Sequence, residues 1–181
     1  MKKLFVVLLG SFLLFASCNR DAKMTADAVL DRASTPGLDA SAVTTLISDS
    51  GITRYRITTQ TWQVFDKADP VYWEFPDGIY LEKFNYDLEV ETWLRSDYAH
   101  YDESKQIWEL RGHVQSMNTD SEFFETPQLF WNQKTERIHS DSSITITRQT
   151  SIIKGVGFDS NQELTKYTIH NPTGVFPIKD E

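Results

Sequence analysis

The chain has 181 residues, a formal net charge of -8 and an aromatic content of 13%. An acidic chain of this kind repels phosphate backbones, which excludes nucleic acid as a partner. The aromatic content is too high for a disordered or purely structural lipoprotein, so the chain must bury an apolar interior or expose an apolar binding surface. Its length fits one domain after an export signal.

The N-terminus has the features of a bacterial lipoprotein signal. Lys2 and Lys3 precede an apolar run over residues 4–15, which is shorter than the roughly 20 residues that cross a membrane. Small residues then lead to Cys18, the single cysteine of the chain, which excludes an internal disulfide. We therefore expect residues 1–17 to be removed and Cys18 to be acylated, with several acyl chains giving a stable membrane anchor. The alternative is that Cys18 is a buried core thiol.

Residues 18–42 are small and polar, contain Pro36 and Gly37 and lack aromatic residues, which predicts a tether or a loosely docked arm. Strand patterns begin at Val43 and continue to about Asn171, so residues 43–171 are expected to form the folded domain. Pro172 and Gly174 end the last strand pattern. Residues 172–181 are therefore predicted to be a loose tail.

Within the domain, strand patterns alternate with turn signals. Residues 43–47 and 52–57 flank the turn sequence 48–51 and predict an opening hairpin. Later turn signals recur at the 8 to 12 residue spacing that is typical of an all-β sandwich or roll. Leu164, Tyr167 and Ile169 are assigned to the last strand. The fold class predicted from the residues is all-β.

The chain also repeats itself. Residues 96–114 resemble residues 126–144 at a constant offset of about 30 residues, with apolar strand positions and polar turn positions in step. A unit that cannot cover its own apolar face must stack on its neighbours. The repeat therefore predicts stacked β-hairpins that present a surface, in place of a compact catalytic centre.

No motif of catalytic or metal chemistry occurs. The four histidines, His100, His113, His139 and His170, lack metal-ligand spacing and are expected to face solvent. The segment 155–157 is too short for a phosphate-binding loop and is expected to form a bulge or tight turn. We therefore predict no enzyme activity, no metal and no cofactor.

Five segments, taken in order along the chain, carry a family resemblance: residues 51–56, 93–101, 107–114, 126–129 and 154–158. This ordered set resembles the LptC family, the membrane-anchored periplasmic subunit of the machine that exports lipopolysaccharide. The resemblance covers about residues 46–169, which is nearly the whole predicted domain.

The resemblance implies an open, twisted β-jellyroll whose two antiparallel sheets form a V-shaped trough for lipid acyl chains. It implies that the protein receives lipopolysaccharide from an LptBFG-type ABC transporter in the inner membrane and passes it to an LptA-like periplasmic protein. Many family members have a transmembrane helix at the N-terminus, whereas this chain has the predicted acylated Cys18. We expect a lipid-anchored protein on the periplasmic face of the inner membrane of a Gram-negative bacterium, and its retention there is inferred from the family alone.

The candidate lipid-binding residues are the apolar positions of the repeat and of the earlier strands. Ordinary packing between sheets is the equally weighted alternative for each of them. They are Trp73, Leu81, Phe84, Tyr101, Trp108, Val114, Leu129, Trp131, Ile138, Ile144 and Ile146. Lipid phosphates are expected to meet isolated bases at the rim, such as Arg95, Arg111 or Lys154.

Two edges are expected to bind partners. The last strand, with Leu164, Tyr167 and Ile169, is predicted to add a strand of an LptA-like protein. The opening hairpin, with Gly51, Ile52 and Tyr55, is predicted to face the transporter. Two other functions stay open at this point: a glycan-binding or scaffold lipoprotein with a closed β-sandwich, and a hydrolase with two carboxylates facing each other across a cleft.

Overall fold

The computed structural model describes residues 31–173, and this part of the chain consists of strands and turns without a helix. Accordingly, no helix within these residues is able to cross a membrane. The predicted signal and the predicted acylation site, Cys18, lie outside the described residues. The strands are β1 (Leu38–Asp49), β2 (Ile52–Phe65), β3 (Tyr72–Phe75), β4 (Ile79–Phe84), β5 (Val90–Ser96), β6 (Tyr98–Asp102), β7 (Ile107–Met117), β8 (Phe123–Asn132), β9 (Arg137–Thr147), β10 (Ile152–Asn161) and β11 (Tyr167–Thr173).

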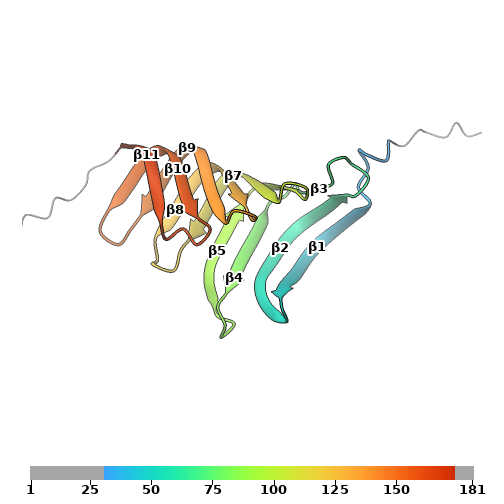
Figure 1. The fold of residues 1–181 in the computed structure, drawn as a ribbon, viewed down its shortest axis with the longest axis horizontal. Helices are drawn as coiled ribbons and strands as arrows, with labels where there is room; N and C mark the ends of the chain where they lie inside the picture. The colour runs from blue at the N-terminus through green and yellow to red at the C-terminus, as the bar shows by residue number, and fades with distance from the viewer. Residues whose placement is uncertain (1–30, 174–181) are drawn as a thin grey trace, which may run out of the picture. The chain divides into compact units, whose positions relative to one another are not determined.

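Every strand pairing is antiparallel, and the pairings join all eleven strands into one hydrogen-bonded sheet (Figure 1). The sheet forks at two strands. β2 pairs with β4 through its first half and with β3 through its end, while β7 pairs with β6 through its first half and with β5 through its end. The β3–β6 and β4–β5 pairings complete the circuit. The predicted all-β jellyroll is confirmed. One wall is formed by β4, β5 and the halves of β2 and β7 that pair with them, and the other wall by β3, β6 and the remaining halves of β2 and β7. Both walls belong to one continuous sheet that turns back on itself.

The predicted opening hairpin is confirmed, because β1 pairs with β2 around a turn at Ser50 and Gly51. β1 nevertheless begins at Leu38, inside the segment 18–42 that was predicted as an arm, and β11 ends at Thr173, inside the predicted tail. The boundaries predicted for the folded domain were therefore too narrow. β1 pairs with β2 on one side only and is mostly exposed, so it needs few apolar residues and shows weak alternation.

The internal repeat corresponds to a repeated hairpin. β7 and β9 have 11 residues each, and their buried positions follow nearly the same order, with Val114 and Ile144 as equivalent buried residues. The turns that precede them also match, since Gln106 and Glu136 have φ angles of 56° and 55°. The second half of the sheet is thus built by stacking similar hairpins, as the repeat predicted.

Bulges interrupt the ladders of the repeated strands. Register shifts occur in the β7–β8, β8–β9 and β9–β10 pairings. Gly112 and Gly157 lie at these interruptions with φ angles of 70° and 81°. The prediction that residues 155–157 form a bulge is confirmed. Because a bulge bends its strand and increases the local twist, these breaks let the long strands contribute to both walls.

The same side-chain hydrogen-bond pattern stabilises three turns. Asn85, Asn118 and Asn161 each open a turn and accept two backbone N–H groups on the side-chain Oδ1. In the third turn Leu164 has a φ of 56° and is only 4% exposed. The assignment of Leu164 to the last strand was therefore wrong. Leu164 is a turn residue whose apolar character reflects burial of the turn against the rest of the domain.

The core lies between the walls. Its most deeply buried large side chains are Phe75, Phe158, Ile57 and Leu110. The same cluster includes residues from β2, β4, β5 and each of β6 to β10, so both walls and the repeated hairpins share one apolar interior. Burial of these apolar side chains, which contributes about 25 cal/mol per Å² of apolar surface, is the main stabilising contribution to the fold.

Candidate functional site

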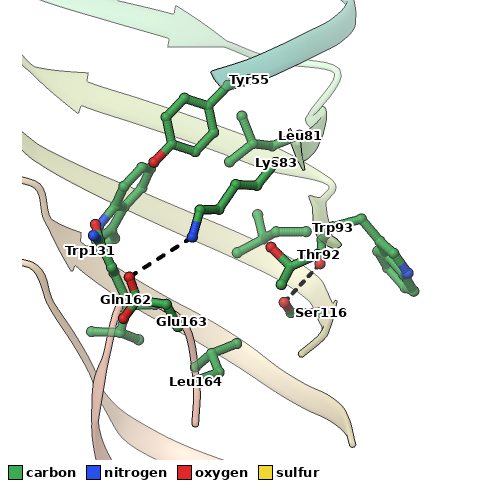
Figure 2. A pocket seen from close by; sticks show the side chains of 12 residues that line it. Tyr55, Leu81, Lys83, Thr92, Trp93, Ser116, Trp131, Gln162, Glu163 and Leu164 are labelled. Atoms are coloured by element: carbon green, nitrogen blue, oxygen red, sulfur yellow. Dashed lines mark hydrogen bonds and ion pairs between the residues drawn. The ribbon is translucent and has the colours of Figure 1, made fainter. Parts of the chain in front are cut away.

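An apolar pocket lies between the two walls. Its lining comes from β2, β4, β5, β7, β8 and β9 and from the turn between β10 and β11 (Figure 2). Seven of the twelve lining residues are apolar or aromatic, and the other five are polar or charged. The lining residues are Tyr55, Leu81, Lys83, Thr92, Trp93, Leu94, Ser116, Trp131, Ile138, Gln162, Glu163 and Leu164.

The alternation of side chains along β4 determines which of its residues line the pocket. Along β4, Ile79, Leu81 and Lys83 point inward, because successive side chains of a strand face opposite sides. Leu81 is opposite Ile57 of β2, and Lys83 is opposite Tyr55. On its inward face β4 therefore has an apolar stripe, Ile79 and Leu81, followed by the cation Lys83 at the mouth of the pocket.

Aromatic rings continue the apolar lining deeper into the domain. The ring of Trp131 lies 6.3 Å from that of Tyr55 and 6.5 Å from that of Trp108, measured between centroids. Trp108 in turn stacks on Phe75 at 5.5 Å and contacts Tyr101 at 4.8 Å. Trp108 and Trp131 also line a smaller apolar cavity with residues of β4, β5 and β7. The rings of Tyr55, Trp131, Trp108, Phe75 and Tyr101 therefore form a continuous series of contacts from the pocket into the core, which we call the aromatic chain.

The aromatic chain contains two indole nitrogens that are buried. The buried Nε1 atoms of Trp108 and Trp131 have no hydrogen-bond partner among the described residues. A buried donor without a partner costs about 1 to 3 kcal/mol. The Nε1 atom of Trp62 is in the same state but lines neither cavity, and each of these atoms is reached by a bound molecule only when neighbouring side chains move.

The predicted lipid-binding residues divide into three groups. Leu81, Trp108, Trp131 and Ile138 line the pocket or the adjoining cavity. Trp73 and Tyr101 contact each other farther along the aromatic chain, at 5.0 Å between ring centroids.

The third group does not line these cavities. Val114, Leu129, Ile144 and Ile146 are at most 2% exposed and belong to the packed core. Phe84 contacts the guanidinium of Arg56 at 5.2 Å and lies outside both cavity linings. For these residues the alternative of ordinary packing fits the structure better.

Sequence reasoning missed several lining residues. Tyr55 was assigned to a partner interface but lies in the mouth of the pocket, and Leu164 was assigned to an exposed edge but is buried against it. Lys83 was not considered, although the alternation of β4 points it to the same face as Leu81. Glu163 follows from no sequence pattern, because its place depends on how the turn packs.

The electrostatics of the mouth are set by one cation and its neighbours. The ammonium of Lys83 lies 3.3 Å from the carboxylate of Glu91 and 3.9 Å from that of Glu163. Burial raises the pKa of the Tyr55 hydroxyl, while the nearby Lys83 charge lowers it and Glu163 raises it further. Tyr55 therefore stays neutral and serves as an amphipathic wall between the apolar interior and the charged mouth.

The rim bases predicted to meet phosphates have protein partners. Arg111 forms an ion pair with Glu109 at 2.7 Å, and Arg95 donates to Gln115 at 2.6 Å. Neither these residues nor Lys154 line the pocket. The assignment to isolated bases was therefore wrong for Arg95 and Arg111.

Both predicted partner edges are edge strands. β1 pairs with β2 alone and β11 pairs with β10 alone, so within residues 31–173 each has one side free of strand pairing. Gly51 and the 37% exposed Ile52 lie at the tip of the opening hairpin. Tyr167 and Ile169 lie on β11, where Tyr167 packs on Phe124 at 5.4 Å. The edges expose backbone hydrogen-bonding groups that can pair with another strand.

The histidines do not form a ligand set. His113 and His170 are exposed and each contacts one aspartate, whereas His139 stacks on Phe130 at 4.9 Å. Within the described residues no three groups of metal-ligating type come together.

One carboxylate outside the pocket predicts an acid-sensitive contribution to stability. Lys105, with hydrogen bonds from Ser104 and the Lys105 backbone, lowers the pKa of Asp102 to about 2. A lowered pKa stabilises the folded state above the unfolded value of about 4, and this contribution disappears as the pH falls toward 2. Because Lys105 is well exposed, we expect only about 1 to 2 kcal/mol. Urea unfolding of Asp102→Asn should show this deficit at pH 7 and a much smaller one near pH 2, whereas a deficit that does not change with pH would contradict the assignment.

Comparison with known proteins identifies the family of the chain. A search of curated protein sequences finds no match to the chain. A family model described as "Lipopolysaccharide-assembly, LptC-related" matches residues 4–174, which is nearly the whole chain. The family is associated with the periplasmic side of the inner membrane in Gram-negative bacteria and is a component of a transport system. The chain therefore belongs to the LptC family, and its function is lipopolysaccharide transport.

Proposed function

We propose that the pocket between the walls holds the acyl chains of lipopolysaccharide during transport. The residues proposed to contact the chains are Leu81, Trp108, Trp131 and Ile138, together with Tyr55 and Leu94. The observation that carries this proposal is the apolar stripe on β4 that faces the aromatic chain of β7 and β8.

The unpartnered indole groups support the same proposal. Acyl chains of lipopolysaccharide carry ester, amide and hydroxyl oxygens, which accept hydrogen bonds. The Nε1 groups of Trp108 and Trp131 would donate to such oxygens and recover the cost of their burial. A pocket lined by aliphatic residues alone would lack these donors.

The energetics favour a shielded route for the lipid. Each acyl CH₂ exposed to water costs about 0.8 kcal/mol, so a lipid with several chains does not cross an aqueous space unaided at a useful rate. Transfer between two similar apolar pockets is nearly neutral in free energy. The direction of transport must then come from ATP hydrolysis in the transporter.

We propose that the two edge strands connect the protein to its neighbours. The hairpin tip at Gly51 and Ile52 would face an LptBFG-type transporter, and β11 would pair with a strand of an LptA-like periplasmic protein. Support comes from the two edges, each paired with a single strand. Backbone pairing joins the sheets of two such proteins and continues the apolar face from one to the next.

We further propose that the protein is held at the inner membrane through acylated Cys18. Digestion of the protein from its native membrane with trypsin should yield an N-terminal peptide that begins at Cys18 and ends at Arg20. Its mass should exceed that of the bare peptide by a diacylglyceryl group, with or without a third acyl chain. An unmodified Cys18 or an uncleaved signal would rule out this anchor.

The test of the proposed function is depletion of the protein in its own bacterium. Newly made, isotope-labelled lipopolysaccharide should accumulate in the inner-membrane fraction, and expression of the full chain should restore its arrival at the outer membrane. A variant with the pocket blocked by a charge at the partly buried Leu81, Leu81→Asp, should not restore it. Normal delivery by the blocked variant would contradict the assignment of the pocket.

A further inference from the structure

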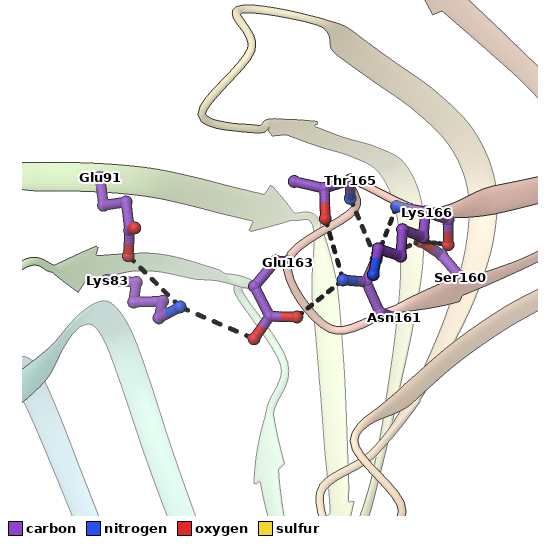
Figure 3. A network of polar contacts seen from close by, with 7 residues as sticks. All are labelled: Lys83, Glu91, Ser160, Asn161, Glu163, Thr165 and Lys166. Carbon is purple, nitrogen blue, oxygen red and sulfur yellow. Dashed lines mark hydrogen bonds and ion pairs between the residues drawn. The ribbon is translucent and has the colours of Figure 1, made fainter.

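Lys83 is an unusual residue for an apolar wall. It takes the third inward position of β4 after Ile79 and Leu81, and its side chain is 25% exposed. Two carboxylates approach its ammonium, Glu91 at 3.3 Å and Glu163 at 3.9 Å (Figure 3). Partial burial of an ammonium requires an anion beside it. Glu91 and Glu163 meet this requirement in the present arrangement.

The two carboxylates are held differently. Glu91 is part of β5, next to β4 in the sheet, whereas Glu163 lies in the turn between β10 and β11. Glu163 is the more distant of the two from Lys83, and its carboxylate also accepts a hydrogen bond from Asn161 of the same turn at 2.9 Å. Movement of the turn would remove Glu163 from Lys83 and leave Glu91 in place.

The turn covers part of the pocket. Leu164 packs into it, and the Leu164 carbonyl accepts a hydrogen bond of 2.9 Å from Asn118 of the neighbouring hairpin. The equivalent position of the first asparagine turn, Leu88, is 61% exposed. The turn around Leu164 is thus directed over the pocket, while the turn around Leu88 extends into solvent.

With the turn in place, the pocket is too small for an acyl chain. Its free volume is about 50 Å³, whereas pockets that hold small molecules measure roughly 300 to 1,000 Å³. The turn contributes Gln162, Glu163 and Leu164 to the lining (Figure 2). Entry of an acyl chain therefore requires the turn to move away.

We propose that Lys83 binds a phosphate group of the lipid headgroup, and that this phosphate replaces Glu163 and releases the turn 161–166 from the pocket. The inference rests on the proposed function of the pocket. A phosphate offers several acceptor oxygens and forms a shorter charge-assisted hydrogen bond than the 3.9 Å contact it displaces. Release of the turn then couples recognition of the charged headgroup to opening of the apolar interior.

The test uses the purified full chain in detergent and two probes: lipid A with two phosphates, and the same lipid with both phosphates removed. Binding is followed by tryptophan fluorescence, since Trp131 lines the pocket, and the turn is followed by amide hydrogen exchange of residues 161–166. The wild type should bind the phosphorylated lipid roughly tenfold more tightly, which corresponds to about 1.4 kcal/mol. At equal, sub-saturating concentrations the phosphorylated lipid should accelerate exchange in the turn more than the dephosphorylated lipid does.

Two variants separate the roles of the residues. Lys83→Gln should remove the tenfold preference and the difference in exchange between the two lipids. Glu163→Gln should tighten the binding of both lipids several-fold because the turn is held less firmly. Lys105→Gln and Glu103→Gln are the matched controls, because both residues lie in the β6–β7 turn and neither lines the pocket. The controls should behave as the wild type.

The outcomes are distinct. A Lys83→Gln variant that keeps the preference for phosphorylated lipid would overturn the inference, and so would exchange in the turn that is unaffected by either lipid. Failure of the wild type to bind both lipids would instead overturn the proposed function of the pocket. Removal of the preference by Lys83→Gln but not by Lys105→Gln would support the inference.

Discussion

Replacing Leu81 by Asp should abolish lipopolysaccharide transport while leaving the fold in place. Leu81 lines both the pocket and the adjoining cavity and is only partly buried in the absence of lipid, so water can still reach a carboxylate there. A bound acyl chain would exclude that water and leave the charge without solvation, which costs several kcal/mol. We expect delivery to the outer membrane to fall on the order of a hundredfold. The measurement is labelled lipopolysaccharide in the outer membrane of depleted cells that express the variant.

Two controls make this result specific. Leu88→Asp introduces the same change at a position that is 61% exposed, where the positive φ of 62° suits aspartate. Leu81→Met keeps the pocket apolar at similar volume. Both variants should transport normally. If Leu81→Asp transports as well as Leu88→Asp, acyl chains do not contact this wall.

Replacing Gly78 by Ala should strongly destabilise the domain. Gly78 lies in the turn between β3 and β4 with a φ of 77°, and a Cβ atom there would lie 2.0 Å from the backbone oxygen of Ser96. Its carbonyl also accepts a hydrogen bond of 2.8 Å from the buried Thr59 hydroxyl. Backbone atoms of β4, β5 and β2 would have to shift together, so we expect a loss of at least about 3 kcal/mol of unfolding free energy. Denaturant unfolding of the full chain measures it.

Gly51 provides the matched comparison. It has a similar φ of 81°, but a Cβ atom there would meet nothing within 4 Å. Gly51→Ala should therefore cost only the roughly 1 to 2 kcal/mol of the left-handed conformation. Equal losses in the two variants would show that the close approach at Gly78 contributes nothing.

The repeat and the turn chemistry made much of the fold predictable. The offset between residues 96–114 and 126–144 reflects a real hairpin unit, because both copies must bury one face and turn at the same place. The hairpin turn at Ser50 and Gly51 was predictable for a similar reason, because glycine adopts the positive φ that a tight turn requires. Local signals of this kind depend on a few adjacent residues.

The edges of the domain were less predictable. β1 contains polar and small residues and buries little, so its first residues carry no apolar alternation even though they pair with β2. Pairing of an exposed edge strand depends on backbone hydrogen bonds, which leave a weak pattern in the side chains.

The pocket was predictable only in part. Apolar residues that line it and apolar residues that pack behind it have the same composition and spacing, so Trp131 and Ile144 were not distinguishable in the sequence. Lys83 and Leu164 were missed for a different reason. Their roles depend on a turn that meets a strand about 80 residues away in the chain, a contact set by tertiary packing.

Photo-crosslinking to lipopolysaccharide in living cells tests the central claim most directly. A photoreactive residue in place of Trp131 would lie in the lining of the pocket, and one in place of the exposed Lys134 would lie in the nearby β8–β9 turn. Lipid adducts that form at position 131, are absent at position 134 and depend on ATP turnover are the predicted result. A folded, membrane-bound protein that forms no adduct at position 131, or equal adducts at both positions, would contradict transport through this pocket.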